Sequence, residues 1–126
     1  MKRVVYDTAV LIAADRGDRK TWIEHKARLA SGVVPMVPAT VVAQASRSPK
    51  QASLRRLLQG CDVHTIDEAG AHAAGALLGR SATTDVVDAS VVVLAARHHA
   101  VVATGDAYDL RRLVAATGKK LDIIEV

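Results

Sequence analysis

The sequence is poor in the residues that cross-link, interrupt or anchor a chain. It has a single cysteine, Cys61, so no intramolecular disulfide can form and nothing indicates an oxidising compartment. Its 8 glycines and 3 prolines are too few for a collagen-like or low-complexity chain. No apolar run approaches the roughly 18 residues that a membrane helix needs, and Asp7 and Asp15 cut the first apolar stretch too short for a signal peptide. We therefore expect a cytoplasmic protein without a membrane partner.

Aromatic residues are nearly absent. There is no phenylalanine, and Tyr6, Trp22 and Tyr108 are the only aromatic residues, whereas alanine occurs 23 times and valine 18 times. Small aliphatic side chains favour close packing of helices on a sheet, and they leave no set of aromatic rings on which nucleic-acid bases could stack. A chain of 126 residues has the length of one domain. We predict a single domain over residues 1–126, able to form a core without metal or disulfide support.

The excess of positive charge is small. The chain has 17 basic and 13 acidic residues, a balance that permits a polyanionic partner without demonstrating one. Two basic runs stand out, the first formed by Arg47, Lys50, Arg55 and Arg56 and the second by Arg111, Arg112, Lys119 and Lys120. Taken alone, each run is typical of a solvated helix face.

Short β-rich runs alternate with helical patterns along the chain. Strands are expected at 3–6, 33–37, 63–66, 101–104 and 121–126, and helices at 19–30, 38–45, 51–59, 67–79, 85–99 and 107–117. Pro35 indicates an edge position or a strand end, and Pro38 suits the first turn of a helix. The alternation predicts an α/β fold of three layers, with a central parallel sheet of about four to five strands and helices on both faces.

Acidic residues gather where the first and fourth of these strands end. Asp7 ends the first strand, and Asp106 follows the strand at 101–104 by two residues. Asp85 and Asp88 lie in the first turn of the helix that leads into that strand. If the two strands are neighbours, their carboxyl ends bring Asp7, Asp88 and Asp106 to one rim of the sheet.

Crowded carboxylates indicate a cation, because without one they repel each other and raise one another's pKa. Oxygen ligands without a cysteine or a nearby histidine suit Mg²⁺ or Mn²⁺ and do not suit zinc. Such a site can activate a water molecule for displacement at phosphorus. Each acid also has a structural interpretation: Asp85 and Asp106 can cap helices, Asp109 can complement a helix dipole, and Asp7 can be a turn residue.

Three segments resemble, in order, the motifs of the PIN-domain family. They are VVYDTAVLI at 4–12, DVVDASVVVLA at 85–95 and VVATGDAYDL at 101–110. The resemblance spans nearly the whole chain and implies a PIN-like fold. It also implies a Mg²⁺- or Mn²⁺-dependent endoribonuclease of the VapC type, the toxin of a bacterial toxin–antitoxin pair.

The resemblance assigns roles to individual positions. It implies that Asp7, Asp88 and Asp106 are the catalytic, metal-binding acids, that Asp85 and Asp109 are auxiliary acids, and that Thr104 is an orienting hydroxyl. It further implies a homodimer whose site is covered by the C-terminal segment of a cognate antitoxin. The first basic run then becomes a candidate for holding the phosphates of an RNA substrate.

One position departs from the family pattern. The segment PATVVAQ at 38–44 places Gln44 where the family usually has a glutamate. An amide is neutral, although its carbonyl oxygen can still contact a metal ion or water. The change predicts weaker metal affinity, an altered metal preference or low activity. It leaves open a second function, that of a PIN-fold module that binds RNA or protein without cutting.

A phospho-acceptor receiver domain is the third alternative, since it shares the length and the α/β alternation. It needs a pair of acids after the first strand and a lysine after a late strand. Only Asp7 ends the first strand, and no lysine follows the strand at 101–104. The sequence therefore disfavours a receiver domain.

Overall fold

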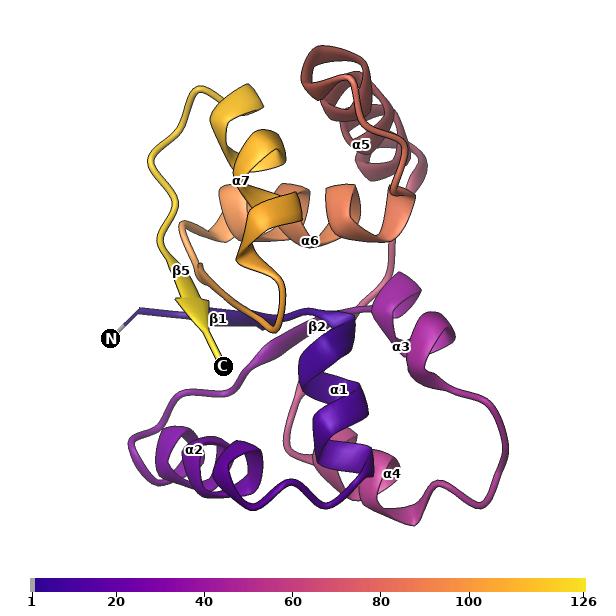
Figure 1. The fold of residues 1–126 in the computed structure, drawn as a ribbon, viewed down its shortest axis with the longest axis vertical. Helices are drawn as coiled ribbons and strands as arrows, with labels where there is room; N and C mark the ends of the chain where they lie inside the picture. Colours follow the sequence, from indigo (N-terminus) through magenta and orange to yellow (C-terminus); the bar gives the residue numbers. More distant parts are fainter. Residues whose placement is uncertain (1) are drawn as a thin grey trace.

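A parallel sheet of five strands forms the centre of the computed structural model, which describes residues 2–126 (Figure 1). The strands are β1 (Val4–Tyr6), β2 (Met36–Pro38), β3 (Asp62–His64), β4 (Val101–Thr104) and β5 (Ile123–Glu125). Their order across the sheet is β3-β2-β1-β4-β5, and every neighbouring pair is parallel. The strand order reverses direction on either side of β1, so β1 and β4 meet at the switch point where such sheets build their sites.

Helices cover both faces of this sheet. They are α1 (Thr8–Asp15), α2 (Arg19–Ala30), α3 (Ala39–Ala45), α4 (Ala52–Gln59), α5 (Glu68–Ser81), α6 (Val86–His98) and α7 (Ala107–Ala116). Figure 1 shows α1, α2 and α4 on one face and α5, α6 and α7 on the other, with α3 beside the edge of the first group. The predicted three-layer α/β architecture is therefore present.

The central strands are buried because helices press on them from both sides. Every residue of β1, β2 and β4 is buried, whereas the edge strands β3 and β5 are largely exposed. The buried aliphatic side chains form one cluster that includes Leu11 of α1, Leu57 of α4 and Val92 of α6. Along residues 2–126, no helix has both the length and the apolar character needed to cross a membrane.

The structure corrects three details of the sequence-based assignment. Pro35 lies just before β2, an interior strand, so the edge position is wrong and the strand-end alternative is right. Pro38 ends β2 and precedes the first turn of α3 instead of lying within it. Residues 9–14, which lie outside the strands and helices expected from the sequence, belong to α1, whose N-terminus is capped by Asp7.

Candidate active site at the carboxyl ends of β1 and β4

The pairing of β1 with β4 brings the acidic motifs together. Tyr6 is opposite Ala103 in the register, so the residues that follow, Asp7 and Thr104, emerge side by side. The backbone N–H of Asp7 donates to the carbonyl of Ala103 at 3.2 Å and extends the pairing by one step. The first and fourth strands are therefore neighbours, as the predicted meeting of these acids required.

Asp7 is a buried carboxylate at the start of α1. Its side chain is only 6% exposed, and its Oδ1 accepts a hydrogen bond from the backbone N–H of Val10 at 3.2 Å. Burial raises the pKa of Asp7, while hydrogen bonds from the Thr104 side chain and from nearby backbone N–H groups partly offset this rise. Asp7 therefore caps α1 and also presents a partly desolvated carboxylate at the end of β1.

Asp88 lies at the electrostatic centre of the acidic group. Its pKa is raised to about 6, first by burial and then by repulsion from Asp85, Asp7, Asp109 and Asp106, in that order. These four acids thus lie within electrostatic reach of Asp88, and we call the five together the acid rim. Asp85 caps α6 by accepting from the Asp88 backbone N–H at 2.9 Å, so its structural interpretation holds beside its place in the rim.

Thr104 links the two strand ends. Its side chain is fully buried; its hydroxyl is hydrogen-bonded to Asp7 and accepts from the backbone N–H of Asp106 at 2.8 Å. Asp106 occupies the N-cap position of α7, yet its side chain makes no capping hydrogen bond. The predicted capping role of Asp106 is therefore wrong, and its exposed carboxylate is available to a ligand.

Gly105 lets this turn lie against α1. A Cβ atom at Gly105 would come within 2.6 Å of the Cβ of Ala9, closer than real Cβ atoms approach. Any larger residue would push the Thr104–Asp106 turn away from α1. The glycine therefore fixes the spacing between Asp106 and the start of α1, where Asp7 lies.

Gln44 is at the rim as well. It is exposed on α3, and its side-chain carbonyl accepts a hydrogen bond from the hydroxyl of Thr8, the residue after Asp7. The structure thus brings the neutral residue to the acids, where the family pattern has a glutamate. Its carbonyl is shared with Thr8, so this amide is a weaker ligand than a carboxylate would be.

The donor chemistry of the acid rim suits a hard divalent cation. Carboxylate and amide oxygens are the ligands that Mg²⁺ prefers, and a cation would relieve the repulsion that raises the pKa of Asp88. Across residues 2–126, however, no three acidic, histidine or cysteine side chains converge closely enough to hold a metal ion as they stand. Side-chain rotation would have to complete the ligand set, which the exposed Asp106 can provide.

The first basic run lies partly beside the loop between α3 and α4. The Arg47 guanidinium donates to the carbonyl of Ser46 at 2.8 Å, and Arg47 and Arg55 line a hollow beside the loop between α3 and α4. Gln51 ties this loop to Asp15, the last residue of α1, at 3.1 Å. Because α1 has 8 residues, this hollow lies about 12 Å along the helix from Asp7.

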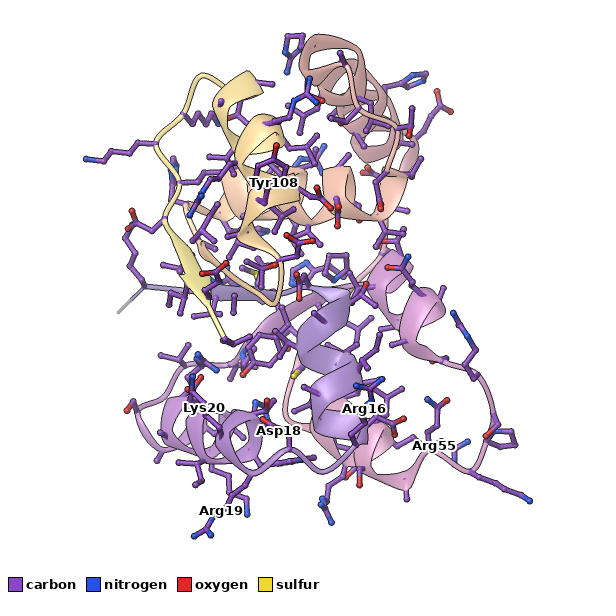
Figure 2. The ribbon with its side chains drawn as sticks, viewed as in Figure 1. Arg16, Asp18, Arg19, Lys20, Arg55 and Tyr108 are labelled. Carbon is purple, nitrogen blue, oxygen red and sulfur yellow. The ribbon has the colours of Figure 1, made fainter. Side chains whose placement is uncertain are left out.

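The other members of the run lie elsewhere. The Arg56 guanidinium stacks over the ring of Trp22 on α2, 4.8 Å from its centroid, and Lys50 is exposed on the loop. Figure 2 shows Arg55 and Arg16 in the lower half of the molecule and Tyr108 in the upper half. The structure therefore splits the run between two surfaces, and only Arg47 and Arg55 share one hollow.

Sequence reasoning missed a pocket that borders the acid rim. An open hollow of about 310 Å³ lies between the start of α6 and the outer side of α7, and we call it the α6–α7 pocket. It is lined by Ala82, Thr83, Thr84, Asp85, Asp88, Tyr108, Asp109, Arg112 and Leu113. The sequence could have indicated this pocket, because Tyr108 lies between Asp106 and Asp109 and Arg112 follows it by about one helical turn.

Likeness to known proteins is found among solved structures. No protein-family model and no curated protein sequence matches the chain significantly, but 25 chains of solved structures do. A chain of VapBC2 from Rickettsia felis, solved with promoter DNA, has a TM-score of 0.74 at 13% identity, with 98% of each chain covered.

Two further structures show the same likeness. A toxin–antitoxin complex from Klebsiella pneumoniae gives 0.66 at 19% identity, covering 84% of this chain and 88% of that one. FitAcB from Neisseria gonorrhoeae gives 0.61 at 15% identity, covering 97% and 96%. The chain therefore has the PIN-like α/β fold of these proteins, as the sequence predicted.

Proposed function

We propose that this chain is a metal-dependent endoribonuclease that acts as the toxin of a bacterial toxin–antitoxin pair in the cytoplasm. The observation that carries the proposal is the acid rim, in which burial and then repulsion from four further carboxylates raise the pKa of Asp88 at the switch point of the sheet. The similar structure from Klebsiella pneumoniae is a toxin–antitoxin complex, which supports the toxin role and an antitoxin partner.

Each residue of the rim has a distinct task in this proposal. Asp7, Asp88 and Asp106 hold Mg²⁺ or Mn²⁺, with Asp85 and Asp109 as auxiliary acids. When bound, the ion supplies a Lewis acid and an activated water for displacement at phosphorus. Thr104 fixes the orientation of the Asp7 carboxylate and of the turn that carries Asp106.

The RNA substrate lies along α1 in this proposal. Its backbone extends from the acid rim to the hollow at the far end of the helix, where Arg47 and Arg55 contact phosphates and the exposed Lys50 adds positive charge. Arg56, stacked on Trp22, contributes through that stacking and not through direct contact with the same phosphates. Replacing Arg55 with alanine should therefore weaken RNA binding and reduce its salt dependence more than Arg56→Ala does.

The test is cleavage of a mixed RNA pool by the purified chain with Mg²⁺, Mn²⁺ or EDTA. We expect metal-dependent cleavage that Asp7→Asn reduces at least about 100-fold, because the loss of one ligand removes several kcal/mol of stabilisation in the transition state. Asp7→Asn should remain folded, since an amide oxygen can still accept the N–H of Val10. Cleavage that persists in EDTA or in Asp7→Asn would contradict the proposed nuclease.

A second candidate function follows from Gln44. Its engagement by Thr8 and the lack of a preformed metal cluster in residues 2–126 favour a module that binds RNA or protein without cutting. Gln44→Glu distinguishes the two functions. Cleavage by the wild type that increases in Gln44→Glu supports a damped nuclease, whereas cleavage by Gln44→Glu alone supports a binding module with a disabled site.

The toxin role has its own test in cells. Expression of the chain in bacteria without its antitoxin should slow growth, and Asp106→Ala should restore it because a proposed metal ligand is lost. Equal growth of the two strains at equal protein levels would count against a toxin. The proposed homodimer is checked separately by light scattering of the purified chain, which should give twice the 13.3 kDa of one chain.

A further inference from the structure

Tyr108 presents the most exposed large apolar side chain of the described molecule. It is 77% exposed, and Figure 2 shows it on α7 in the upper half of the molecule. The other two aromatic rings are engaged within the protein: Trp22 lies under the guanidinium of Arg56, and Tyr6 is buried against His25. Tyr108 is thus the one tyrosine or tryptophan ring of residues 2–126 that offers a face to a ligand.

The position of this ring relates it to the acid rim. Tyr108 lines the α6–α7 pocket together with Asp85, Asp88 and Asp109. A ligand that stacked on the ring would therefore lie beside these carboxylates. Bases of single-stranded nucleic acids stack on exposed aromatic side chains in this way, whereas the face of a paired base within a duplex is covered by its neighbours.

Arg112 adds a cation to the same pocket. It follows Tyr108 by four residues, so both side chains lie on one face of α7, one turn apart. Within the described residues Arg112 forms no ion pair or hydrogen bond. Its guanidinium is therefore available for a phosphate.

We propose that the α6–α7 pocket binds one unpaired nucleotide of single-stranded RNA, with the base stacked on Tyr108 and a phosphate held by Arg112. This inference rests on the proposed RNA-cleaving function and adds to it a subsite on the α7 side of the acid rim. Together with the hollow at the far end of α1, it places RNA contacts on both sides of the acids. The pocket thereby restricts the substrate to unpaired segments.

Binding is measured in the Asp7→Asn background, so that cleavage does not interfere. The probes are fluorescein-labelled single-stranded oligoadenylate and oligouridylate, and the oligoadenylate–oligouridylate duplex, in fluorescence anisotropy titrations. We expect Tyr108→Ala to weaken single-strand binding about tenfold and Tyr108→Phe to change it less than about twofold, since the ring is what stacks. The duplex should bind more weakly than either strand and be insensitive to Tyr108.

Adjacent arginines on α7 provide a matched control. Arg111 and Arg112 are both exposed and have the same charge, but only Arg112 lines the pocket. Arg112→Ala should reduce the slope of log affinity against log salt by about 0.7, the value for one phosphate contact to a single strand. Arg111→Ala should leave the slope unchanged. Because both side chains and Tyr108 are exposed, the variants should unfold at the temperature of the parent chain.

Several outcomes would overturn the subsite. Unchanged single-strand affinity in Tyr108→Ala would do so, as would equal effects of Arg111→Ala and Arg112→Ala, or no RNA binding by the parent chain. Loss of antitoxin binding without loss of RNA binding in Tyr108→Ala would assign the surface to a protein partner instead. If RNA binding depends on Tyr108 but the wild type never cuts, the subsite stands and the nuclease proposal fails. If the wild type cuts and Tyr108→Ala cuts with unchanged KM, the nuclease stands and the subsite fails.

Discussion

Two consecutive residues at the end of β1 belong to polar groups of opposite character. Tyr6 is the last residue of β1, and Asp7 follows it directly as the N-cap of α1. The Tyr6 hydroxyl is 2.9 Å from Nδ1 of His25 and accepts from the Arg28 guanidinium at 3.1 Å. We call these three residues the Tyr6 cluster. Asp7 instead faces Asp88 of α6, and each carboxylate of the acid rim adds repulsion there.

The difference separates a stabilising polar group from a functional one. In the Tyr6 cluster the hydroxyl can donate to a neutral His25 while it accepts from Arg28, so each buried polar atom has a partner. In the acid rim, Asp7 is buried and Asp88 half-buried among carboxylates that form no ion pair within residues 2–126, which costs folding free energy unless a cation is supplied. A fold that keeps such repulsion at its switch point is organised for a ligand.

The largest effect on stability is expected from His25→Ala. His25 is only 2% exposed, and its ring contacts those of both Tyr6 and Trp22. Removing it leaves a cavity and deprives the Tyr6 hydroxyl of a partner, which should lower the free energy of unfolding by about 3 kcal/mol. Urea denaturation measures this. A change smaller than that caused by the exposed-site variant Tyr108→Ala would show that the Tyr6 cluster does not stabilise the fold.

Tyr6→Phe is a milder perturbation of the same cluster. The ring stays in place, but His25 and Arg28 each lose a hydrogen-bonding partner. We expect the free energy of unfolding to fall by about 1–2 kcal/mol, with RNA cleavage per folded molecule unchanged. A loss of cleavage larger than the loss of folded protein would mean that the Tyr6 cluster also contributes to activity.

Asp88→Asn should have the opposite sign and stabilise the protein. The pKa of Asp88 is raised from 3.8 to about 6 in the folded state, so its carboxyl group favours folding below pH 3.8 and this contribution is lost as pH rises through 6. The amide removes the repulsion at pH 7. After discounting for the partial exposure of the side chain, we expect a gain of about 1 kcal/mol at pH 7 that disappears near pH 4. Destabilisation at pH 7 would refute this.

The two regions should also respond oppositely to acid. Burial lowers the pKa of His25 from 6.5, and the nearby Arg28 lowers it further. Neutral His25 therefore contributes stability above pH 6.5 that is lost as pH falls through the lower, folded-state pKa. Protonation of Asp88, by contrast, increases the stability of the folded protein as pH falls through about 6. Between pH 7 and pH 5, the free energy of unfolding should therefore fall more in Asp88→Asn than in the wild type. An equal fall in the two proteins would contradict the opposite pH effects of His25 and Asp88.

The fold was predictable from the sequence because its signals are local and repeated. Valine-rich runs such as VVAT at 101–104 mark strands buried on both faces, and their alternation with helical segments specifies a parallel sheet. Pro35 correctly indicated a strand end but not an edge strand, since a proline just before a strand leaves the hydrogen bonds of an interior strand intact. The helix α1 escaped assignment because it is short and largely apolar, with no amphipathic pattern to mark it.

The site was predictable to the extent that its residues lie at strand ends and helix starts. Register alone brings Asp7 to Thr104, and the first turn of α6 carries Asp88. The separation of Arg56 from Arg55 depends on which sides of α4 face Trp22 and solvent, a tertiary contact that charge counting does not contain. The role of Tyr108 could not be predicted, because a count of three aromatic residues does not show which of them is exposed.

The most direct test of this account is thermal unfolding of the wild type and of Asp88→Asn with and without millimolar Mg²⁺ or Mn²⁺ at pH 7, with ionic strength held constant. If the acid rim is organised for a cation, the metal should raise the Tm of the wild type by several degrees, since it binds only the folded state. In Asp88→Asn the baseline Tm should be higher and the metal shift largely lost. Equal metal shifts in the two proteins, or none in the wild type, would contradict the claim that the repulsion around Asp88 marks a metal site.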